Sequence, residues 1–263
     1  MTPALRWTGA AWLDVTVKPP PEEAAVAIVI DGSSQAVLMA TPHDLDDFAT
    51  GFALTEGLIQ TPDDITDFEV AEVETAGLTA YEARLWLRPG LAAGLADRRR
   101  AMVGPVGCGL CGVDSIDAAL PAVVPVTSGA TFVPSDIDDA MAALSAGQVR
   151  WQQTPSIHAA CLWTRVGAVV REDVGRHNAL DKLAGAVARQ GGQAAQGIVA
   201  MTSRLSVDLV QKAARMGAPV LAGVGVPTQL AIAWADACGM TLVGRARDGA
   251  FDAFAGAKRL QGA

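Results

Sequence analysis

The feature that most constrains the fold is a regular alternation of short apolar runs and amphipathic stretches from residue 135 to residue 243. The apolar runs have the length of buried strands, and the longer stretches show helical periodicity. The predicted strands are 159–165, 168–171, 197–202, 219–222 and 240–243, and the predicted helices are 135–147 (with Ser135 as N-cap), 176–190, 205–216 and 228–238. Because strands that alternate with helices form mainly parallel sheets with helices on both faces, this region is predicted to be an α/β domain.

The preceding residues predict a smaller α/β unit. The apolar runs 25–30 and 36–39 flank the turn signal Asp31-Gly32, which is typical of a β-hairpin. A helix is expected from Thr41-Pro42, since threonine is a good N-cap and proline suits the first helical turn. Residues 81–88 alternate in polarity as a half-buried strand does. The apolar residues expected on one face of the helix are Leu45, Phe48, Phe52 and Ile59.

These elements divide the chain into two domains and a linker. We expect a small N-terminal α/β domain over 1–104, a mobile cysteine loop and linker over 105–125, and a larger α/β/α domain over 126–263. The first ~20 residues, which end near Pro19-Pro20-Pro21, are expected to form an extended leading segment.

Charge and hydropathy exclude several classes of protein. The net charge of −8 argues against a nucleic-acid-binding protein, which would show a basic face. No run approaches the roughly 20 apolar residues that span a bilayer, and the N-terminus lacks a basic region followed by an apolar run. We therefore expect a cytoplasmic protein without a membrane segment. In such a reducing compartment the four cysteines are not expected to form a disulfide framework.

Residues 104–112 contain four glycines and one proline in nine positions, a composition that suits neither a helix nor a central strand. This segment is therefore predicted to be a mobile loop that carries two thiols, Cys108 and Cys111. A thiol that accepts sulfur must be ionised, reachable and free to move between donor and acceptor. Because glycine flanks Cys108 on both sides and follows Cys111, this segment gives its thiols reach, and Cys108 and Cys111 are the candidate catalytic residues.

Other chemistries stay open for these thiols. His158 and Cys161 would complete a zinc site of three cysteines and one histidine, although residues three apart on a strand face opposite sides. A dithiol redox pair is a second alternative. Deaminase chemistry is excluded, because the only upstream histidine, His43, is followed by Asp44-Leu45 and not by the required glutamate. Cys161 and Cys238 are expected to be core residues.

Polar residues also follow the ends of several predicted strands. In α/β sheets, ligands collect beyond the carboxyl ends of the strands, where arginine binds phosphate and glycine permits close backbone approach. The candidate binding residues are Arg176, His177, Ser203, Arg204, Arg245, Ala246, Arg247, Asp248, Gly249 and Ala250. For the stretch 172–182, a capped helix start with surface salt bridges is an equally simple interpretation.

Four blocks, in this order along the chain, resemble the formate dehydrogenase accessory sulfurtransferase family, FdhD. They are Ala40-Thr41-Pro42-His43-Asp44-Leu45 with Phe48, Gly51-Phe52 and Glu56-Gly57; Gly107-Cys108-Gly109-Leu110-Cys111-Gly112; Glu172-Asp173-Val174-Gly175-Arg176-His177-Asn178-Ala179-Leu180-Asp181-Lys182; and Thr202-Ser203-Arg204 with Val210-Gln211-Lys212. The resemblance covers roughly residues 26–260, and the third block is highly specific. The segment 245–250 departs from the family pattern, because Arg-Asp-Gly-Ala stands where a Pro-Gly-Arg type is expected.

The resemblance implies a three-layer, cytidine-deaminase-like α/β/α fold for the larger domain, without deaminase activity. It implies a sulfurtransferase that takes sulfur from a cysteine desulfurase, holds it on Cys108 as a persulfide, and passes it to a bound acceptor, the molybdenum bis(molybdopterin guanine dinucleotide) cofactor. The cofactor is then inserted into formate dehydrogenase. Cys111 matches the second cysteine of the family motif, segment 245–250 matches the family's cofactor-binding segment, and the family implies a homodimer.

Two other functions remain as alternatives. The first is a non-catalytic chaperone for the molybdenum cofactor or a guanine nucleotide, with a structural zinc site. The second is a dithiol oxidoreductase, which requires a disulfide between Cys108 and Cys111 that cycles with substrate.

Overall fold

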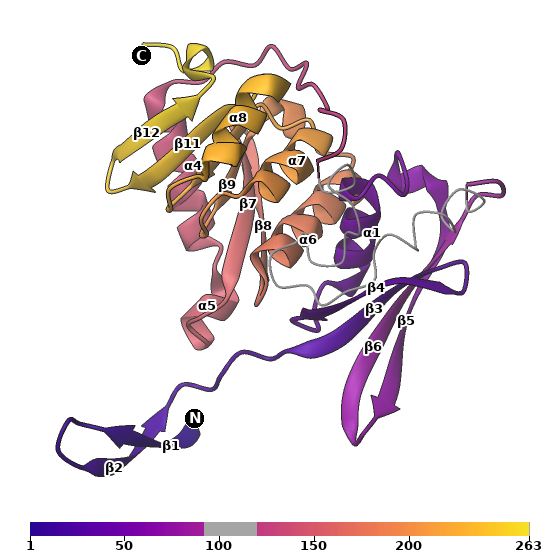
Figure 1. Cartoon of the computed structure of the whole chain (residues 1–263), viewed down its shortest axis with the longest axis vertical. Helices are drawn as coiled ribbons and strands as arrows, with labels where there is room; N and C mark the ends of the chain where they lie inside the picture. Colours follow the sequence, from indigo (N-terminus) through magenta and orange to yellow (C-terminus); the bar gives the residue numbers. More distant parts are fainter. Residues whose placement is uncertain (92–119, 263) are drawn as a thin grey trace.

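The larger domain is built on a six-stranded sheet (Figure 1). The structure is a computed structural model, and it describes residues 1–91 and 120–262. The strand order is β12-β11-β10-β9-β7-β8. The strands are β7 (His158–Thr164), β8 (Gly167–Asp173), β9 (Ile198–Met201), β10 (Val220–Gly223), β11 (Thr241–Arg247) and β12 (Ala250–Ala255). Because β7 is antiparallel to both β8 and β9, strands β8 to β11 all point the same way.

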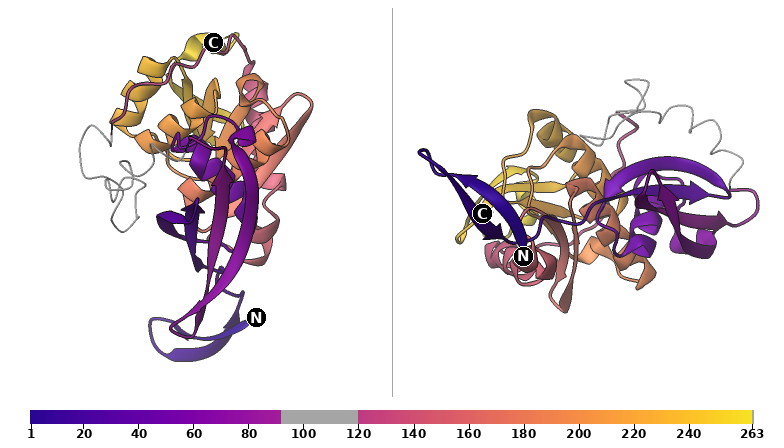
Figure 2. Two further views of the ribbon diagram at one scale, coloured as in Figure 1. Left: turned by 90° about the vertical axis from the view of Figure 1, so that its right-hand side faces the viewer. Right: turned by 90° about the horizontal axis from the view of Figure 1, so that it is seen from below.

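Helices cover both faces of this sheet (Figures 1 and 2). One face packs against α6 (Arg176–Arg189), α7 (Val207–Arg215) and α8 (Gln229–Cys238), and the other against α4 (Pro134–Ala146). The alternation along β7 explains the division, since Ala160 and Leu162 face the first group of helices and Ala159 and Cys161 face α4. The short helix α5 (Val149–Gln153) follows α4, and single 3₁₀ turns lie at η3 (Ala194–Gln196) and η4 (Ala257–Arg259).

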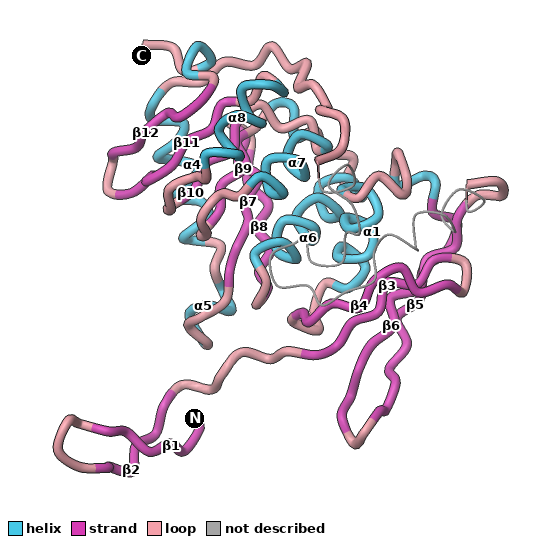
Figure 3. The backbone as a smooth tube through the Cα atoms, in the orientation of Figure 1, coloured by secondary structure: helices cyan, strands magenta, loops and turns pink. Residues whose placement is uncertain are grey.

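The smaller unit has a four-stranded sheet with order β4-β3-β6-β5 (Figure 3). Its elements are β3 (Ala24–Ile30), β4 (Ser33–Ala40), α1 (Leu45–Thr55), the 3₁₀ turn η1 (Pro62–Asp64), β5 (Ile65–Thr75) and β6 (Leu78–Leu87). Phe48 and Phe52 of α1 pack in one buried cluster with Ile28 of β3 and Leu85 of β6. The sheet therefore buries one face against α1.

Helices α1 and α6 join the two units through a close backbone contact. A side-chain carbon added at Gly51 would overlap the backbone carbonyl of Asp181, and one added at Gly185 would overlap that of Asp47. Only glycine lets two helix backbones approach this closely at the crossing point. Gly51 and Gly185 therefore set how closely α1 of the small unit packs against α6 of the large domain.

A hairpin at the N-terminus stands apart from both units (Figures 1 and 2). It consists of β1 (Thr2–Trp7) and β2 (Trp12–Val17), which pair as an antiparallel two-stranded sheet. The extended leading segment predicted from sequence is therefore a folded hairpin followed by the proline run. None of the helices in the two described ranges is long and apolar enough to cross a membrane.

The α/β class is confirmed, and the sequence located most elements of the large domain. Three details were wrong. The sheet is mixed and not mainly parallel, because three of its five strand pairs are antiparallel. Helix α1 begins at Leu45, with Asp44 and not Thr41 at its N-cap, and α4 begins at Pro134, so Ser135 lies inside it. The domain boundaries and the likeness to cytidine deaminase stay predictions, and most of the 105–125 linker lies outside the described residues.

Candidate functional site

A polar cleft of about 210 Å³ lies where β8 leads into α6, beside α1 and the start of β7. Two predicted binding residues, Arg176 and His177, line this cleft together with His158. The full lining is Leu38, Met39, Phe52, Glu56, His158, Val174, Gly175, Arg176, His177, Asn178, Asp181 and Lys212. The cleft therefore collects side chains from the first, third and fourth sequence blocks.

His177 pairs with Asp208 in the first turn of α7, through contact of its Nε2 atom with the Asp208 carboxylate. The two side chains are 14% and 5% exposed. Burial alone would raise the pKa of Asp208, but the hydrogen bond from His177 and its charge lower that pKa overall. The ionised carboxylate holds the His177 ring in one orientation. Asp208 was not identified from the sequence, although an acidic residue in the first turn of a predicted helix is the signal that could have found it.

His158, at the start of β7, lies beside this pair. Burial lowers its pKa, and the charges of Arg176 and His177 lower it further. Its Nδ1 atom is 3.5 Å from the Thr202 hydroxyl, which accepts a hydrogen bond from the Ala159 backbone N–H at 2.9 Å. The ring is therefore held as a neutral imidazole at physiological pH, able to accept a proton or to donate one from its protonated nitrogen.

Two buried ion pairs surround the cleft and hold the helices in place. The Lys182 ammonium is 2.7 Å from Asp173, and both side chains are fully buried. Lys182 also donates to the Thr41 carbonyl at 2.8 Å, and Asp173 accepts the Thr41 backbone N–H at 3.0 Å. These contacts connect α6 and β8 to the segment that precedes α1. Asp173 and Lys182 of the third sequence block therefore have a structural role. The alternative interpretation of this stretch expected salt bridges at the surface, but this ion pair is buried.

The second ion pair joins all three helices near the cleft. Lys212 of α7 contacts Asp181 of α6 at 2.9 Å, Glu56 after α1 at 2.7 Å, and the Thr55 hydroxyl at 3.0 Å. Burial would lower the pKa of Lys212, but Asp181 and Glu56 raise it well above its ordinary range. Lys212 is therefore a permanent cation whose charge is neutralised by its neighbours.

The remaining predicted binding residues lie along the same edge of the sheet, outside the cleft. Ser203 is buried and its hydroxyl donates to the Arg204 carbonyl at 2.9 Å, while the Arg204 side chain is exposed. Gly225, after β10, lies against the Arg204 backbone and its carbonyl accepts the Arg245 N–H at 3.2 Å. The sequence prediction that these strand ends meet at one edge is therefore correct for the loops after β9, β10 and β11.

The segment 245–250 contains the irregular end of β11, the turn Asp248-Gly249 and the first residue of β12. The pairing register shifts between Gly244 and Arg247, and Arg245 and Asp248 adopt left-handed backbone conformations with φ of 53° and 55°. Such bulges redirect side chains next to functional sites. Arg245 pairs with Asp252, and Ala246 is buried in the layer beneath the sheet. The exposed residues of this segment are Arg245, Arg247, Asp248, Gly249 and Ala250.

The two described cysteines are unreactive. Cys161 is 0% exposed and Cys238 is 2% exposed, as expected for core residues. Burial raises the pKa of Cys161 to about 12 and also raises that of Cys238, so both stay thiols at neutral pH. The candidate catalytic residues Cys108 and Cys111 lie outside the described residues.

The zinc alternative fails on the arrangement of its two other ligands. His158 faces the cleft with the α6 side of the sheet, whereas Cys161 is buried against α4 on the opposite face. A single ion cannot bind side chains on opposite faces of one strand at the ~2 Å distances that zinc requires. His158 and Cys161 therefore cannot complete one zinc site.

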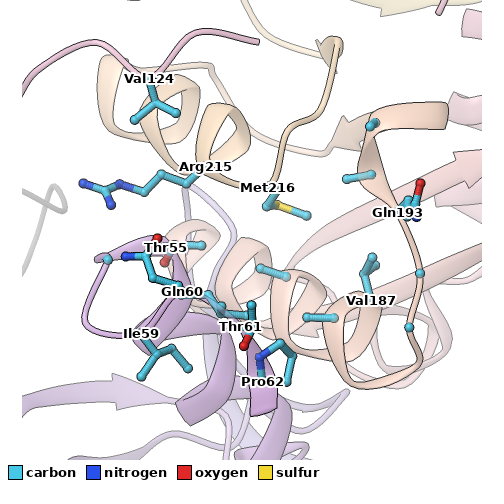
Figure 4. Close-up of a pocket in the computed structure, with 18 residues that line it drawn as sticks. Thr55, Ile59, Gln60, Thr61, Pro62, Val124, Val187, Gln193, Arg215 and Met216 are labelled. Atoms are coloured by element: carbon cyan, nitrogen blue, oxygen red, sulfur yellow. The ribbon is translucent and has the colours of Figure 1, made fainter. Parts of the chain in front are cut away.

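A larger groove of about 570 Å³ lies at the other end of α6, between the turn η1 and the C-terminal end of α7 (Figure 4). Figure 4 shows Ile59, Pro62, Val187 and Met216 along it, with Arg215 at one end. None of the predicted binding residues, all of which belong to the described part of the chain, lines this groove. We place the candidate site in the smaller cleft because two histidines, two carboxylates and two cationic side chains line it.

Comparisons with known proteins agree with the resemblance found in the sequence. Residues 21–261 match the FdhD/NarQ family. Relatives named "Sulfur carrier protein FdhD" include one from Agrobacterium fabrum, 49% identical over 91% of this chain and 88% of its own length, and one from Cupriavidus necator, 43% identical over 91% and 83%. The crystal structure of a protein from Desulfotalea psychrophila, described as a formate dehydrogenase accessory protein, has the same fold, with a TM-score of 0.76, 23% identity, and coverage of 99% and 98%.

Proposed function

Because this chain belongs to the FdhD/NarQ family, we propose that it is a cytoplasmic sulfurtransferase that prepares the molybdenum cofactor of a formate dehydrogenase. Its donor is a cysteine desulfurase, its carrier is a persulfide on Cys108, and its acceptor is the molybdenum bis(molybdopterin guanine dinucleotide) cofactor. The working unit is a homodimer. The names of the relatives, sulfur carrier proteins, support the carrier role.

The burial of two of the four cysteines is the observation that best supports the choice of carrier thiol. The chain has four cysteines, and burial holds both Cys161 and Cys238 as inaccessible thiols with raised pKa values. A sulfur carrier needs an accessible thiolate, because the thiolate is the attacking nucleophile in sulfur exchange. Cys108 and Cys111 are therefore the candidates that remain, and both lie in the glycine-rich segment predicted for a carrier loop.

The proposed loading step moves one sulfur atom between two thiols. The Cys108 thiolate attacks the terminal sulfur of the desulfurase persulfide. The sulfur–sulfur bond of the donor breaks, the desulfurase cysteine leaves as a thiolate, and Cys108 becomes a persulfide. No net oxidation occurs, because one persulfide replaces another.

The proposed delivery step requires two electrons, since the carried sulfur has to leave as sulfide. The Cys111 thiolate attacks the Sγ atom of the Cys108 persulfide, which forms a Cys108–Cys111 disulfide and releases hydrosulfide for the molybdenum. The two thiols supply the electrons, and a cellular thiol reductant regenerates them. The neutral His158 ring and the His177–Asp208 pair are suited to accept and return the protons of these steps.

The small volume of the cleft indicates that different parts of the acceptor cofactor bind at two different places on the protein. At about 210 Å³ the cleft is smaller than the roughly 300–1,000 Å³ of pockets that enclose drug-sized ligands. A bis-dinucleotide cofactor cannot fit inside it. We therefore assign the exposed Arg204, Arg245 and Arg247 to the phosphates and guanine ends, and the cleft to a smaller, reacting part.

Mass spectrometry of the intact chain tests the carrier thiol. After incubation with a cysteine desulfurase and cysteine, the wild-type chain should gain about 32 Da, the mass of one sulfur atom, and should lose it on treatment with dithiothreitol. Cys108→Ala should show no gain. Cys111→Ala should keep the gain but release sulfur more slowly. Cys161→Ala is the matched control and should behave as wild type; a mass gain retained by Cys108→Ala would refute the assignment.

A further inference from the structure

The N-terminal hairpin, β1–β2, exposes an unusual amount of apolar surface for its size. Within 13 residues, Leu5 is 65% exposed, Trp7 53%, Trp12 64% and Leu13 50%. The rings of Trp7 and Trp12, which are opposite each other in the strand pairing, lie 5.5 Å apart. Clustered exposed apolar side chains of this kind mark an interaction surface, whereas single ones do not.

Both faces of the hairpin are apolar. The strand pairing places Leu5, Trp7 and Trp12 on one face, and it places Leu13 and Val15 on the other. A two-stranded hairpin is at best marginally stable in water by itself, because it has no third layer in which to bury either face. The hairpin therefore needs a surface to cover it.

The chain's own body does not supply that surface. The linker after β2 contains Pro19-Pro20-Pro21, and consecutive prolines favour an extended, semi-rigid spacer. Two side chains of this linker contact the body: the Lys18 ammonium donates to the Gln152 carbonyl at 2.7 Å, and the Glu22 carboxylate pairs with His43 at 3.0 Å. Figure 1 shows the hairpin at the end of this linker, away from both sheets.

A matching apolar surface is exposed on the small unit. On β4, Val37 is 57% exposed and Met39 is 53% exposed, and both alternate with residues buried against α1. They therefore lie on the face of the four-stranded sheet that α1 does not cover, next to Ala25 and Ala27 of β3. Among the described strands β4 pairs only with β3, so this face ends at an open sheet edge.

We propose that the hairpin is a dimerisation arm, and that the arm of each copy lies on the β3–β4 face of a second copy. Reciprocal exchange satisfies two-fold symmetry, because each copy supplies one arm and one acceptor face. A buried aromatic side chain removes roughly 150–250 Å² from water, so the Trp7 and Trp12 rings of two arms, which share a face with Leu5, bury about 600–1,000 Å², and the acceptor faces lose surface in addition. This approaches the about 1,200–2,000 Å² of a stable interface.

The arm lies outside the residues that match the family, which begin at residue 21. The inference extends the proposed homodimer by naming its contact surface, and it does not depend on the sulfur chemistry. The same variants can be assayed for the sulfur mass gain, so a failed dimer and a failed carrier thiol give different results.

Light scattering of the full chain after size-exclusion chromatography tests the arm. The wild type should have twice the 27.0 kDa mass of one chain. Trp7→Ser with Trp12→Ser, and separately Val37→Glu, should weaken dimerisation by roughly tenfold or more, since truncating central aromatic contacts has effects of this size. Val166→Glu is the matched control, because Val166 is 98% exposed on the distant β7–β8 turn. All variants should keep the sulfur mass gain.

Mixed cross-linking tests the acceptor face directly. In a Cys108→Ala, Cys111→Ala background, a chain with Leu5→Cys is mixed with a chain with Val37→Cys and oxidised. A disulfide should form between the two different chains. A monomeric wild type, a dimer unaffected by the arm substitutions, or cross-linking no greater than with Val166→Cys as the acceptor would each overturn the proposal.

Discussion

Two sets of residues within the stretch 172–182 have different surroundings. Arg176 and His177 are half-buried and line the cleft, whereas Asp173 and Lys182 form a fully buried ion pair, and Asp181 is buried at the edge of the cleft in an ion pair with Lys212. Both sets belong to the most specific sequence block of the chain. The difference shows that a distinctive motif does not mark only residues that react, because part of it builds the support for the others.

Helix geometry explains why one motif can serve both purposes. Asn178, Asp181, Lys182 and Gly185 recur at the three- and four-residue spacings that share one face of a helix, and this face of α6 meets α1 and the segment before it. Arg176 and His177 occupy the first turn of the same helix, at the sheet edge. A substitution on the α1-facing side should therefore change stability, and one in the first turn should change activity.

The largest expected effect is the loss of stability when the buried Asp173–Lys182 ion pair is broken. Lys182→Met leaves the Asp173 carboxylate without its cation in a fully buried site, which should lower the free energy of unfolding by about 3–5 kcal/mol. Urea denaturation followed by circular dichroism measures it. Arg176→Met, at a half-buried position in the same helix, should cost less than about 1 kcal/mol. Equal losses in the two variants would remove the distinction.

The next effect concerns the helix crossing that supports the motif. Gly51→Ala places a methyl group against the Asp181 backbone, which cannot move as a flexible side chain does, and should cost about 3 kcal/mol through overpacking. Gly129→Ala is the control, because a side-chain carbon there meets nothing within 4 Å. A Gly51→Ala protein with wild-type stability in the same denaturation experiment would show that the helices are free to separate.

On the cleft side the expected effect is on rate. His177→Gln removes the ring that Asp208 orients, and it should slow sulfur delivery by roughly tenfold or more while proton transfer proceeds less efficiently. The extent of sulfur loading on Cys108 should not change. Single-turnover release of hydrosulfide from the loaded chain measures the rate. Unchanged release would leave His177 with a structural role only.

The smallest expected effect is a change in pH dependence. His158 has a lowered pKa because of burial and the nearby Arg176 and His177 charges, so the unfolded chain takes up a proton more readily than the folded one. This contribution to stability is present above the unfolded pKa of about 6.5 and is lost as the pH falls toward the folded pKa. His158→Gln should therefore lose less stability than wild type between about pH 7.5 and 5.5. Denaturation curves at several pH values measure the slope, and identical slopes would contradict a buried neutral ring.

The sequence predicted the regular parts of the fold well, because their apolar patterns are local. Strands β7 and β8 and helix α6 lie within two residues of their predicted positions. Strand β5 was missed although its acidic and apolar residues alternate; none of its residues is fully buried, so it has no continuous apolar run. Strand β12 was missed because the pairing register shifts between Gly244 and Arg247 of β11. Helix α1 starts late because Asp44 adopts a left-handed conformation that no propensity rule predicts.

The site was predicted less completely, for a different reason. Arg176 and His177 stood out because they begin a helix after a strand, but the partner of His177 is Asp208, 31 positions along the chain on another helix. Contacts over such distances leave no local pattern. The buried roles of Asp181 and Lys212 were likewise unpredictable, since charged residues are ordinarily exposed.

The most direct measurement follows labelled sulfur from donor to acceptor. The chain is loaded by a cysteine desulfurase with cysteine that carries radioactive sulfur, is separated from the donor, and is mixed with isolated molybdenum bis(molybdopterin guanine dinucleotide). The label should bind to the wild-type chain and then move to the cofactor fraction, and it should do neither with Cys108→Ala. Label that reaches the cofactor equally well through Cys108→Ala would contradict the proposed carrier.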